Sequence, residues 1–196
     1  MPGITIEAGK AHQALGDIQR ADIYEIQMGD VPAALASFTE QLSDLTNEEV
    51  TDLLKWQARS VTIPQITNQP IETNILGVKR KFPGQSNMAQ TLDITFDEYV
   101  GNRLTKFLDD WFNAVTNYRN ETAGFGLSEG SSRDSLTTDF TIITGKANGG
   151  ASGVKYVFKN VWIESFTPGS LSNDNGATLQ PSATFSFDFQ QLEDNS

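Results

Sequence analysis

The segment of residues 61–84 mixes strand-forming residues with prolines, and it constrains the fold more than any other part of the sequence. Its apolar β-branched residues are Val61, Ile63, Ile66, Ile71, Ile75 and Val78. Pro64, Pro70 and Pro83 each lack a backbone donor, and this restricts proline to the edges, starts and bulges of strands. The segment therefore cannot be the centre of an ordinary sheet. We predict an extended hairpin arm that another copy of the chain completes.

The composition is that of one globular domain with no preference for polyanions. The chain has 196 residues, and its 14 Lys and Arg against 25 Asp and Glu give a net charge of −11. Binding to nucleic acid or to an anionic membrane needs clustered Lys and Arg. The absence of cysteine excludes disulfides and thiolate chemistry. No apolar run reaches the ~18 residues of a membrane-spanning helix, and the N-terminus does not resemble a signal peptide. We expect a single soluble domain over 1–196, without a membrane anchor and not conventionally secreted.

The first half of the chain alternates between strand and helix patterns. Residues 1–20 show no sustained period and are predicted to be an N-terminal arm. Polar and apolar residues alternate over 22–28, which indicates a half-buried strand. Residues 31–53 interrupt this pattern and are predicted to be a surface insertion with short helices. The strand pattern resumes near Leu54 and continues through 56–63, and a further strand is predicted over 91–96.

The strongest helix pattern lies over residues 98–119, and Asp97 is predicted to cap it. Its apolar side chains form one broad stripe: Val100, Leu104, Phe107, Leu108, Trp111, Phe112 and Val115. We expect this helix to flank the sheet. Its predicted core anchors are Leu104, Leu108, Trp111 and Phe112.

The C-terminal third of the chain is predicted to be β structure after a long loop at 120–137. Strand patterns cover 139–144, 155–166 and 181–192. In the last of these, the apolar residues are Ala183, Phe185, Phe187 and Phe189, and the polar residues between them are Thr184, Ser186 and Asp188. One face of this strand is therefore apolar, and the other carries small polar side chains.

No set of residues predicts catalysis, a metal site or a cofactor. His12 is the only histidine, which excludes His-based triads and sites with several histidines. The glycine-rich segment 145–150 lacks the P-loop spacing. The Asn-Gly pair in 173–176 indicates a turn and not a calcium-binding loop. The neighbouring Asp109 and Asp110 point about 100° apart on a helix. We expect no enzymatic activity and no cofactor.

The order of these elements resembles that of the tail tube proteins of contractile-tailed, myovirus-type bacteriophages. The segments that carry the resemblance are 20-RADIYEIQM-28, 56-WQARSVTIP-64, 76-LGVKRKFPG-84, 91-TLDITFDE-98, 108-LDDWFNAV-115, 158-FKNVWIESFTPGSLS-172 and 183-ATFSFDF-189. The resemblance covers residues 20–192, apart from the insertion at 31–53 and the loop at 119–137.

The resemblance implies a mainly β fold: a two-sheet antiparallel sandwich or flattened barrel, flanked by one amphipathic helix, with a long hairpin arm. It also implies a structural subunit of the virion, assembled in the host cytoplasm. Six copies would form a ring around a channel, and the rings would stack into a tube that conducts DNA into the host without binding it specifically. The expected partners are further copies of the chain, the tail sheath protein, and the baseplate and tail terminator proteins.

Two sets of residues are candidates for function within such a tube. The candidates for contact between rings or subunits are Pro64, Asn68, Pro70, Ile71, Ile75 and the basic trio Lys79, Arg80 and Lys81, which we expect where the arm rejoins the sandwich. The candidates for the channel wall are Asp93, Thr184, Ser186 and Asp188, with Glu164 as a weaker one, because an acidic or neutral wall does not hold phosphates.

Three alternatives stay open from the sequence. The chain could form the inner tube of a type VI secretion system or of an extracellular contractile injection system, where the cargo is protein. It could be a free-standing β-sandwich binding module, for example for carbohydrate. A hydrolase with two carboxylates is the third alternative, although its other residues are missing.

Overall fold

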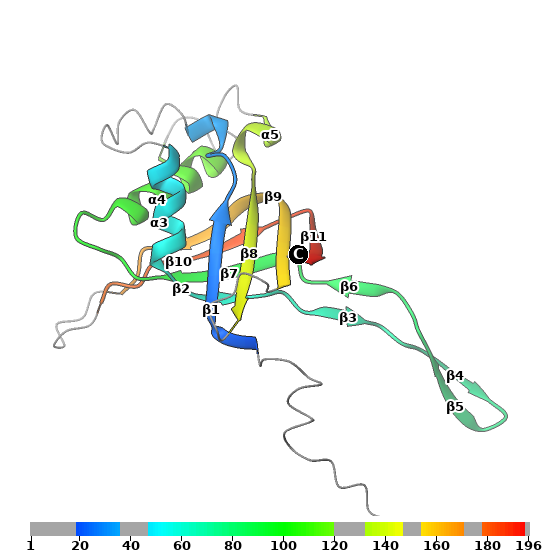
Figure 1. Cartoon of the computed structure of the whole chain (residues 1–196). Helices are drawn as coiled ribbons and strands as arrows, with labels where there is room; N and C mark the ends of the chain where they lie inside the picture. The colour runs from blue at the N-terminus through cyan, green and yellow to red at the C-terminus, as the bar shows by residue number, and fades with distance from the viewer. Residues whose placement is uncertain (1–18, 36–46, 120–131, 147–153, 171–177, 195–196) are drawn as a thin grey trace, which may run out of the picture.

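Most of the chain forms a bent antiparallel sheet with helices against it and a hairpin that projects from one end (Figure 1). The computed structural model describes residues 19–35, 47–119, 132–146, 154–170 and 178–194. Several predictions therefore lie outside the described residues. They concern most of the N-terminal arm, the middle of the 31–53 insertion, most of the loop at 120–137, the glycine-rich turn after residue 146, and the 173–176 turn.

Within the described residues, seven strands form one sheet in the order β1-β8-β9-β10-β7-β2, with β11 also paired to β9. Its strands are β1 (Gln19–Met28), β2 (Ala58–Thr62), β7 (Thr91–Phe96), β8 (Thr138–Lys146), β9 (Val154–Thr167), β10 (Ser182–Ser186) and β11 (Phe189–Asp194). All of the pairings are antiparallel. The prediction of a mainly β, antiparallel fold is confirmed, and the described strands do not close into a barrel.

The long strand β9 joins two halves of this sheet. Its first half pairs with β8 and β11, and the pairing with β8 ends at Val161. Its second half, from Trp162 onward, pairs with β10. Between them, Asn160 has a φ of 55°, a left-handed conformation that asparagine tolerates. The two predicted layers are thus one sheet, with a β8 half (β1, β8, β11 and residues 154–161) and a β10 half (β2, β7, β10 and residues 162–167).

The core lies between the two halves and helix α4 (Arg103–Thr116). Alternate residues of β7 and β10 are buried, and so are residues at helical spacing on α4. Trp111 is at the centre, with its ring 5.5 Å from Phe185 and 6.2 Å from Phe140, centroid to centroid. Its indole Nε1 donates to the carbonyl of Leu136 at 2.9 Å. The β10 half, the β8 half and the helix therefore meet at this one side chain.

Helix α4 begins later than its sequence pattern predicts. Gly101 and Asn102 adopt φ values of 113° and 51°, so the helical geometry starts only at Arg103. The predicted cap Asp97 is wrong: its carboxylate accepts from Arg59 at 3.0 Å, and Glu98 instead accepts from the backbone N–H of Thr105 at 2.8 Å. Val100 is also wrong as part of the apolar stripe, because it precedes the helix and is fully exposed.

The described residues contain three further helical segments: η1 (Ala33–Leu35), α3 (Asn47–Gln57) and α5 (Arg133–Leu136). The strand predicted to resume near Leu54 begins only at Ala58. Val50 and Leu54 are both buried and four residues apart, so the end of the insertion continues as a helix against the core. Helix α5 lies inside the predicted loop at 120–137.

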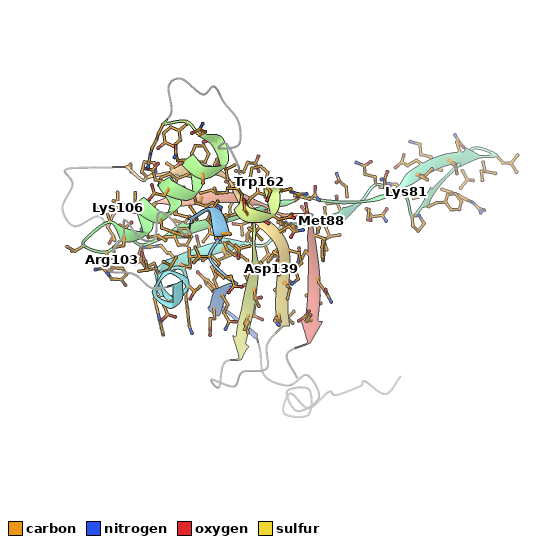
Figure 2. The ribbon with its side chains drawn as sticks, turned by 90° about the horizontal axis from the view of Figure 1, so that it is seen from above. Lys81, Met88, Arg103, Lys106, Asp139 and Trp162 are labelled. Carbon is orange, nitrogen blue, oxygen red and sulfur yellow. The ribbon has the colours of Figure 1, made fainter. Side chains whose placement is uncertain are left out.

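The predicted hairpin arm is present and continues β2 and β7 away from the body (Figures 1 and 2). Its proximal pair is β3 (Ile66–Asn68) with β6 (Ser86–Met88), and its distal pair is β4 (Ile71–Ile75) with β5 (Val78–Phe82). Prolines 70 and 83 lie between these pairs, where the ladder is interrupted, as proline requires. At this interruption the amide of Asn68 bonds both the N–H and the carbonyl of Gly84. The return limb extends to Met88, beyond the predicted end at residue 84.

Candidate assembly surfaces and channel face

The arm has two chemically different sides. Residues opposite each other in an antiparallel pair lie on the same side of the ribbon. The pairs on one side are Ile71 with Phe82, Thr73 with Arg80, and Ile75 with Val78. The pairs on the other side are Glu72 with Lys81 and Asn74 with Lys79, and Glu72 forms an ion pair with Lys81 at 2.9 Å. All four apolar residues of the first side, which we call the apolar side of the arm, are exposed.

The basic trio lies in the distal part of the arm, not where the arm rejoins the body. Ile75 pairs with Val78 across a tight turn, so Lys79, Arg80 and Lys81 follow that turn directly. Strand β6 (Ser86–Met88) then separates them from the body. The predicted position was wrong because the sequence alone did not show that the return limb has a second strand. Figure 2 shows Lys81 far from the body and Met88 at the base of the arm.

The remaining contact candidates differ in their availability. Pro64 is buried within the subunit, so it cannot contact another copy while the subunit keeps this conformation. Asn68 is exposed, but its side chain already bonds Gly84. Pro70, Ile71 and Ile75 are exposed. Of the sequence candidates, the distal apolar residues and the basic trio are exposed on the arm, and within the trio Lys81 is already paired with Glu72.

Three of the four channel-wall candidates share one face of the β10 half. Asp93 lies directly opposite Thr184, whose hydroxyl donates to its carboxylate at 2.6 Å. Ser186 donates to Glu164 at 2.5 Å. The register adds further residues at alternate positions, which sequence reasoning missed in part: Ser60, Thr62, Thr91, Thr95, Ser182, Ser165, Thr167 and Trp162. We call this set, with Asp93, Thr184, Ser186 and Glu164, the polar face; it contains hydroxyls, two carboxylates and one indole, and neither Lys nor Arg.

Asp188 follows the end of β10 and is held by partners other than the residues of the polar face. Strand β10 ends at Ser186, and the chain then turns so that the N–H of Asp188 donates to the carbonyl of Lys159. The Asp188 carboxylate accepts from the Asn160 amide at 2.7 Å and from Arg133. These two partners, the Asn160 amide first, lower the pKa of the Asp188 carboxyl. Simple alternation along 183–189 could not show this turn.

The β10 half ends in two free strand edges among the described residues. Strand β2 is last in the strand order and has a neighbour, β7, on one side only. The second half of β9 pairs with β10 on one side, while β8 on its other side stops at Val161. Unpaired strand edges are ready to pair with another chain. The two edges therefore offer different contacts at the two sides of the polar face.

The helix anchors named from the sequence lie at the interface of α4 with the sheet. Leu104, Leu108 and Trp111 are fully buried, whereas Phe112 is half-buried and its ring packs against Tyr118. Within the described residues, no group of three or more His, Cys, Asp or Glu could hold a metal ion. The helices described here are all too short or too polar to cross a membrane.

The chain was compared with protein-family models, with curated proteins and with solved structures. A family model described as phage tail tube protein matches residues 19–191. Among solved structures, the chain resembles the sheath/tube terminator structure of an extracellular contractile injection system, PVC, in the extended state, with a TM-score of 0.59, 16% identity, and coverage of 91% of this chain and 99% of that one. It also resembles the anti-feeding prophage tube terminating cap, with a TM-score of 0.58, 13% identity, and coverage of 98% and 96%. A search of curated proteins gave no match.

Proposed function

Because this chain belongs to the phage tail tube protein family, we propose that six copies form a ring and that stacked rings form the tube through which DNA leaves a virion. The observation that carries this proposal is the β10 half, where a polar face without Lys or Arg lies between two free strand edges. A sheet with this form is suited to closing into a barrel with its own copies, and closure removes the edges.

The lateral contact follows from the strand order. Reading across the β10 half, the strands alternate in direction from β9 to β10, β7 and β2. Placing β2 of one copy beside the second half of β9 in the next continues this antiparallel alternation. Each contact joins two different edges, so it is heterologous and closes into a ring when the rotation permits.

The polar face then lines the channel. Its Asp93 and Glu164 carboxylates recur once per subunit around the ring, and hydroxyls fill the spaces between them. A wall of this kind repels or ignores phosphates, whereas clustered Lys or Arg would bind them. DNA can therefore pass without being held.

The arm supplies the axial contact. It extends the strands β2 and β7 beyond the body, and its strands pair with one another and not with the main sheet. Its apolar side is exposed in one subunit, and within the basic trio Lys81 pairs with Glu72 on the arm itself. We assign Pro70, Ile71, Ile75, Lys79, Arg80 and Lys81 to contact with the adjacent ring.

The further partners are a sheath around the tube and the proteins at its two ends. The similar structures come from assemblies whose descriptions name a sheath-tube complex, a tube terminating cap and a baseplate. These similarities support the same classes of partner here: tail sheath, terminator and baseplate proteins.

A tube that carries protein is the second candidate. The observation that favours it is the similarity in fold to extracellular contractile injection systems, which extends over 97% of the chain. Recovery of this protein from virions that contain DNA would support the phage tail, and recovery from particles that contain effector proteins and no DNA would support the injection system.

The decisive experiment shortens the arm. Residues 67–87 are replaced by Asn-Gly, a pair suited to a two-residue hairpin, so that Ile66 and Met88 remain as the closing pair. We expect the melting temperature to stay close to that of the full chain, and electron micrographs to show rings without tubes. Tubes from the shortened chain would contradict the axial role of the arm, and loss of folding would show that the arm belongs to the core of the subunit.

A further inference from the structure

We propose that Trp56, Tyr99 and Val100 form the site on one subunit that receives the apolar side of the arm from a second copy in the adjacent ring. This inference rests on the proposed tube and adds the acceptor surface to it. We call these three residues the aromatic patch.

The aromatic patch consists of large apolar side chains that face water. The exposed fractions are 73% for Trp56 and 64% for Tyr99, and Val100 is fully exposed. Two contacts hold the segments together: the Asp97 N–H donates to the carbonyl of Gln57 at 2.8 Å, and Arg59 forms an ion pair with Asp97 at 3.0 Å. The patch is therefore presented on a defined part of the backbone and not on a loose tail.

The patch and the arm lie at opposite ends of the same two strands. Trp56 precedes β2 and the arm follows it, while Tyr99 and Val100 follow β7 and the arm precedes it. Figure 2 shows Arg103, which follows Val100 by three residues, and Lys81 on the arm at opposite sides of the molecule. When subunits repeat along the direction of these strands, the arm of one copy comes to the patch of the next. Such a contact between two different surfaces propagates without closing.

The tip of the arm carries a residue that its own subunit does not explain. Leu76 has a φ of 53°, the left-handed region in which Gly and Asn are favoured, and its side chain is 99% exposed. A side chain with a Cβ is strained in this region. Leucine at this place gains no contact within the subunit that would offset that strain. An apolar partner on another copy provides the contact.

The chemistry of the two surfaces matches. The apolar side of the arm presents Ile71, Ile75, Val78 and Phe82 together with one cation, Arg80. Aromatic rings pack against aliphatic side chains and also attract a guanidinium over their faces. The Lys55 Nζ lies 5.3 Å from the centroid of the Trp56 ring, but Lys55 also pairs with Glu25 at 2.9 Å, and Trp56 stays 73% exposed. The aromatic patch can thus receive the apolar side chains, and the exposed ring of Tyr99 offers a face to Arg80.

The test uses the absence of cysteine from the chain. A variant with Leu76→Cys and Val100→Cys is assembled, oxidised and examined on a denaturing gel without reductant. Both side chains are exposed, so the subunit is expected to fold as before, and circular dichroism checks this. We expect loss of the monomer band and a ladder of covalent multimers that reductant returns to monomer.

Two controls define the outcome. Each single cysteine variant gives at most a dimer, and Leu76→Cys with Leu192→Cys tests an exposed residue (62%) on β11, away from the patch. A second control pair is Leu76→Cys with Asp134→Cys, which lies at a cleft lined by Asp30, Asp134 and Asp139. A ladder of covalent multimers from either control pair would overturn the proposed acceptor. Tubes that assemble without a ladder would overturn the acceptor and leave the tube intact, whereas a wild-type chain that forms no rings or tubes would overturn both.

A charge substitution gives an independent readout. Tyr99→Asp is expected to raise the concentration needed for tube growth by about tenfold or more, as removal of a central interface residue does. Leu192→Asp, the matched control, is expected to leave this concentration unchanged. Equal effects of the two substitutions would overturn the proposal.

Discussion

Trp111 joins helix α4 to both halves of the sheet, and its removal should destabilise the subunit more than any surface change. The side chain is completely buried. Its ring contacts Phe107, Phe140 and Phe185, at centroid distances of 5.8, 6.2 and 5.5 Å. Its Nε1 is also the hydrogen-bond donor to the carbonyl of Leu136, the last residue of α5. The substitution Trp111→Ala therefore removes packing and a buried hydrogen bond together.

The expected loss is large relative to the stability of a domain. Truncation of a buried tryptophan to alanine costs about 3–5 kcal/mol, and an unpaired buried carbonyl adds about 1–3 kcal/mol. Domains are stable by only about 5–15 kcal/mol. For a chain of this length, about 2–4 °C is lost per kcal/mol, so the melting temperature should fall by roughly 8–32 °C.

The matched control is the same substitution at an exposed tryptophan. Trp56→Ala in the dilute subunit should change the stability by no more than about 0.5 kcal/mol, because Trp56 is 73% exposed. Trp111→Phe, which keeps an aromatic ring but loses the bond to Leu136, should lie between the two. Melting followed by circular dichroism and urea titration measures all three. Equal shifts for Trp111→Ala and Trp56→Ala would refute the central role of Trp111.

Three further outcomes are expected. Asp93→Lys adds one cation per subunit to the polar face, so tubes should form but DNA should pass more slowly, as measured by ejection kinetics; normal rates in well-formed tubes would place Asp93 outside the channel. Asn160 and Arg133 lower the pKa of the Asp188 carboxyl, so their contacts with it stabilise the fold above about pH 4, and this stabilisation is lost as pH falls through the lowered pKa. The difference in melting temperature between wild type and Asp188→Asn should therefore shrink from pH 5 to pH 3. A difference that stays constant over this range would contradict the prediction. Replacing Lys79, Arg80 and Lys81 with Glu should prevent tube growth and leave the melting temperature unchanged; unchanged tubes would count against a contact through the trio.

The strand patterns were predictable because a half-buried strand buries every second residue. Leu92, Ile94 and Phe96 alternate with polar residues, and the structure buries all three. The register between strands was not predictable in the same way. Ser60 and Thr62 join the polar face only because β2 pairs with β7, and nothing within residues 58–62 specifies that partner.

Helix boundaries were the least predictable feature, for a local reason. Asp97 before an apolar repeat has the form of a cap, but the left-handed Gly101 and Asn102 delay the helix to Arg103. The Glu98 carboxylate then accepts hydrogen bonds from the N–H and the hydroxyl of Thr105, near the start of the helix, which is the role predicted for Asp97. The pattern of apolar residues could not distinguish these two carboxylates, because both precede the same stripe. For the same reason Val100 appeared to belong to the helix.

Strands β2 and β7 take part in ring closure, in the channel wall and in the stacking of rings. Strands β2 and β7 contribute to the polar face, β2 provides a free lateral edge, and both continue into the arm. The aromatic patch then terminates the same two strands at their other end. A substitution within β2 or β7 should therefore affect ring closure, the channel wall and stacking together. Only residues beyond Ile66 and Met88 on one side, or in the aromatic patch on the other, should separate stacking from the rest.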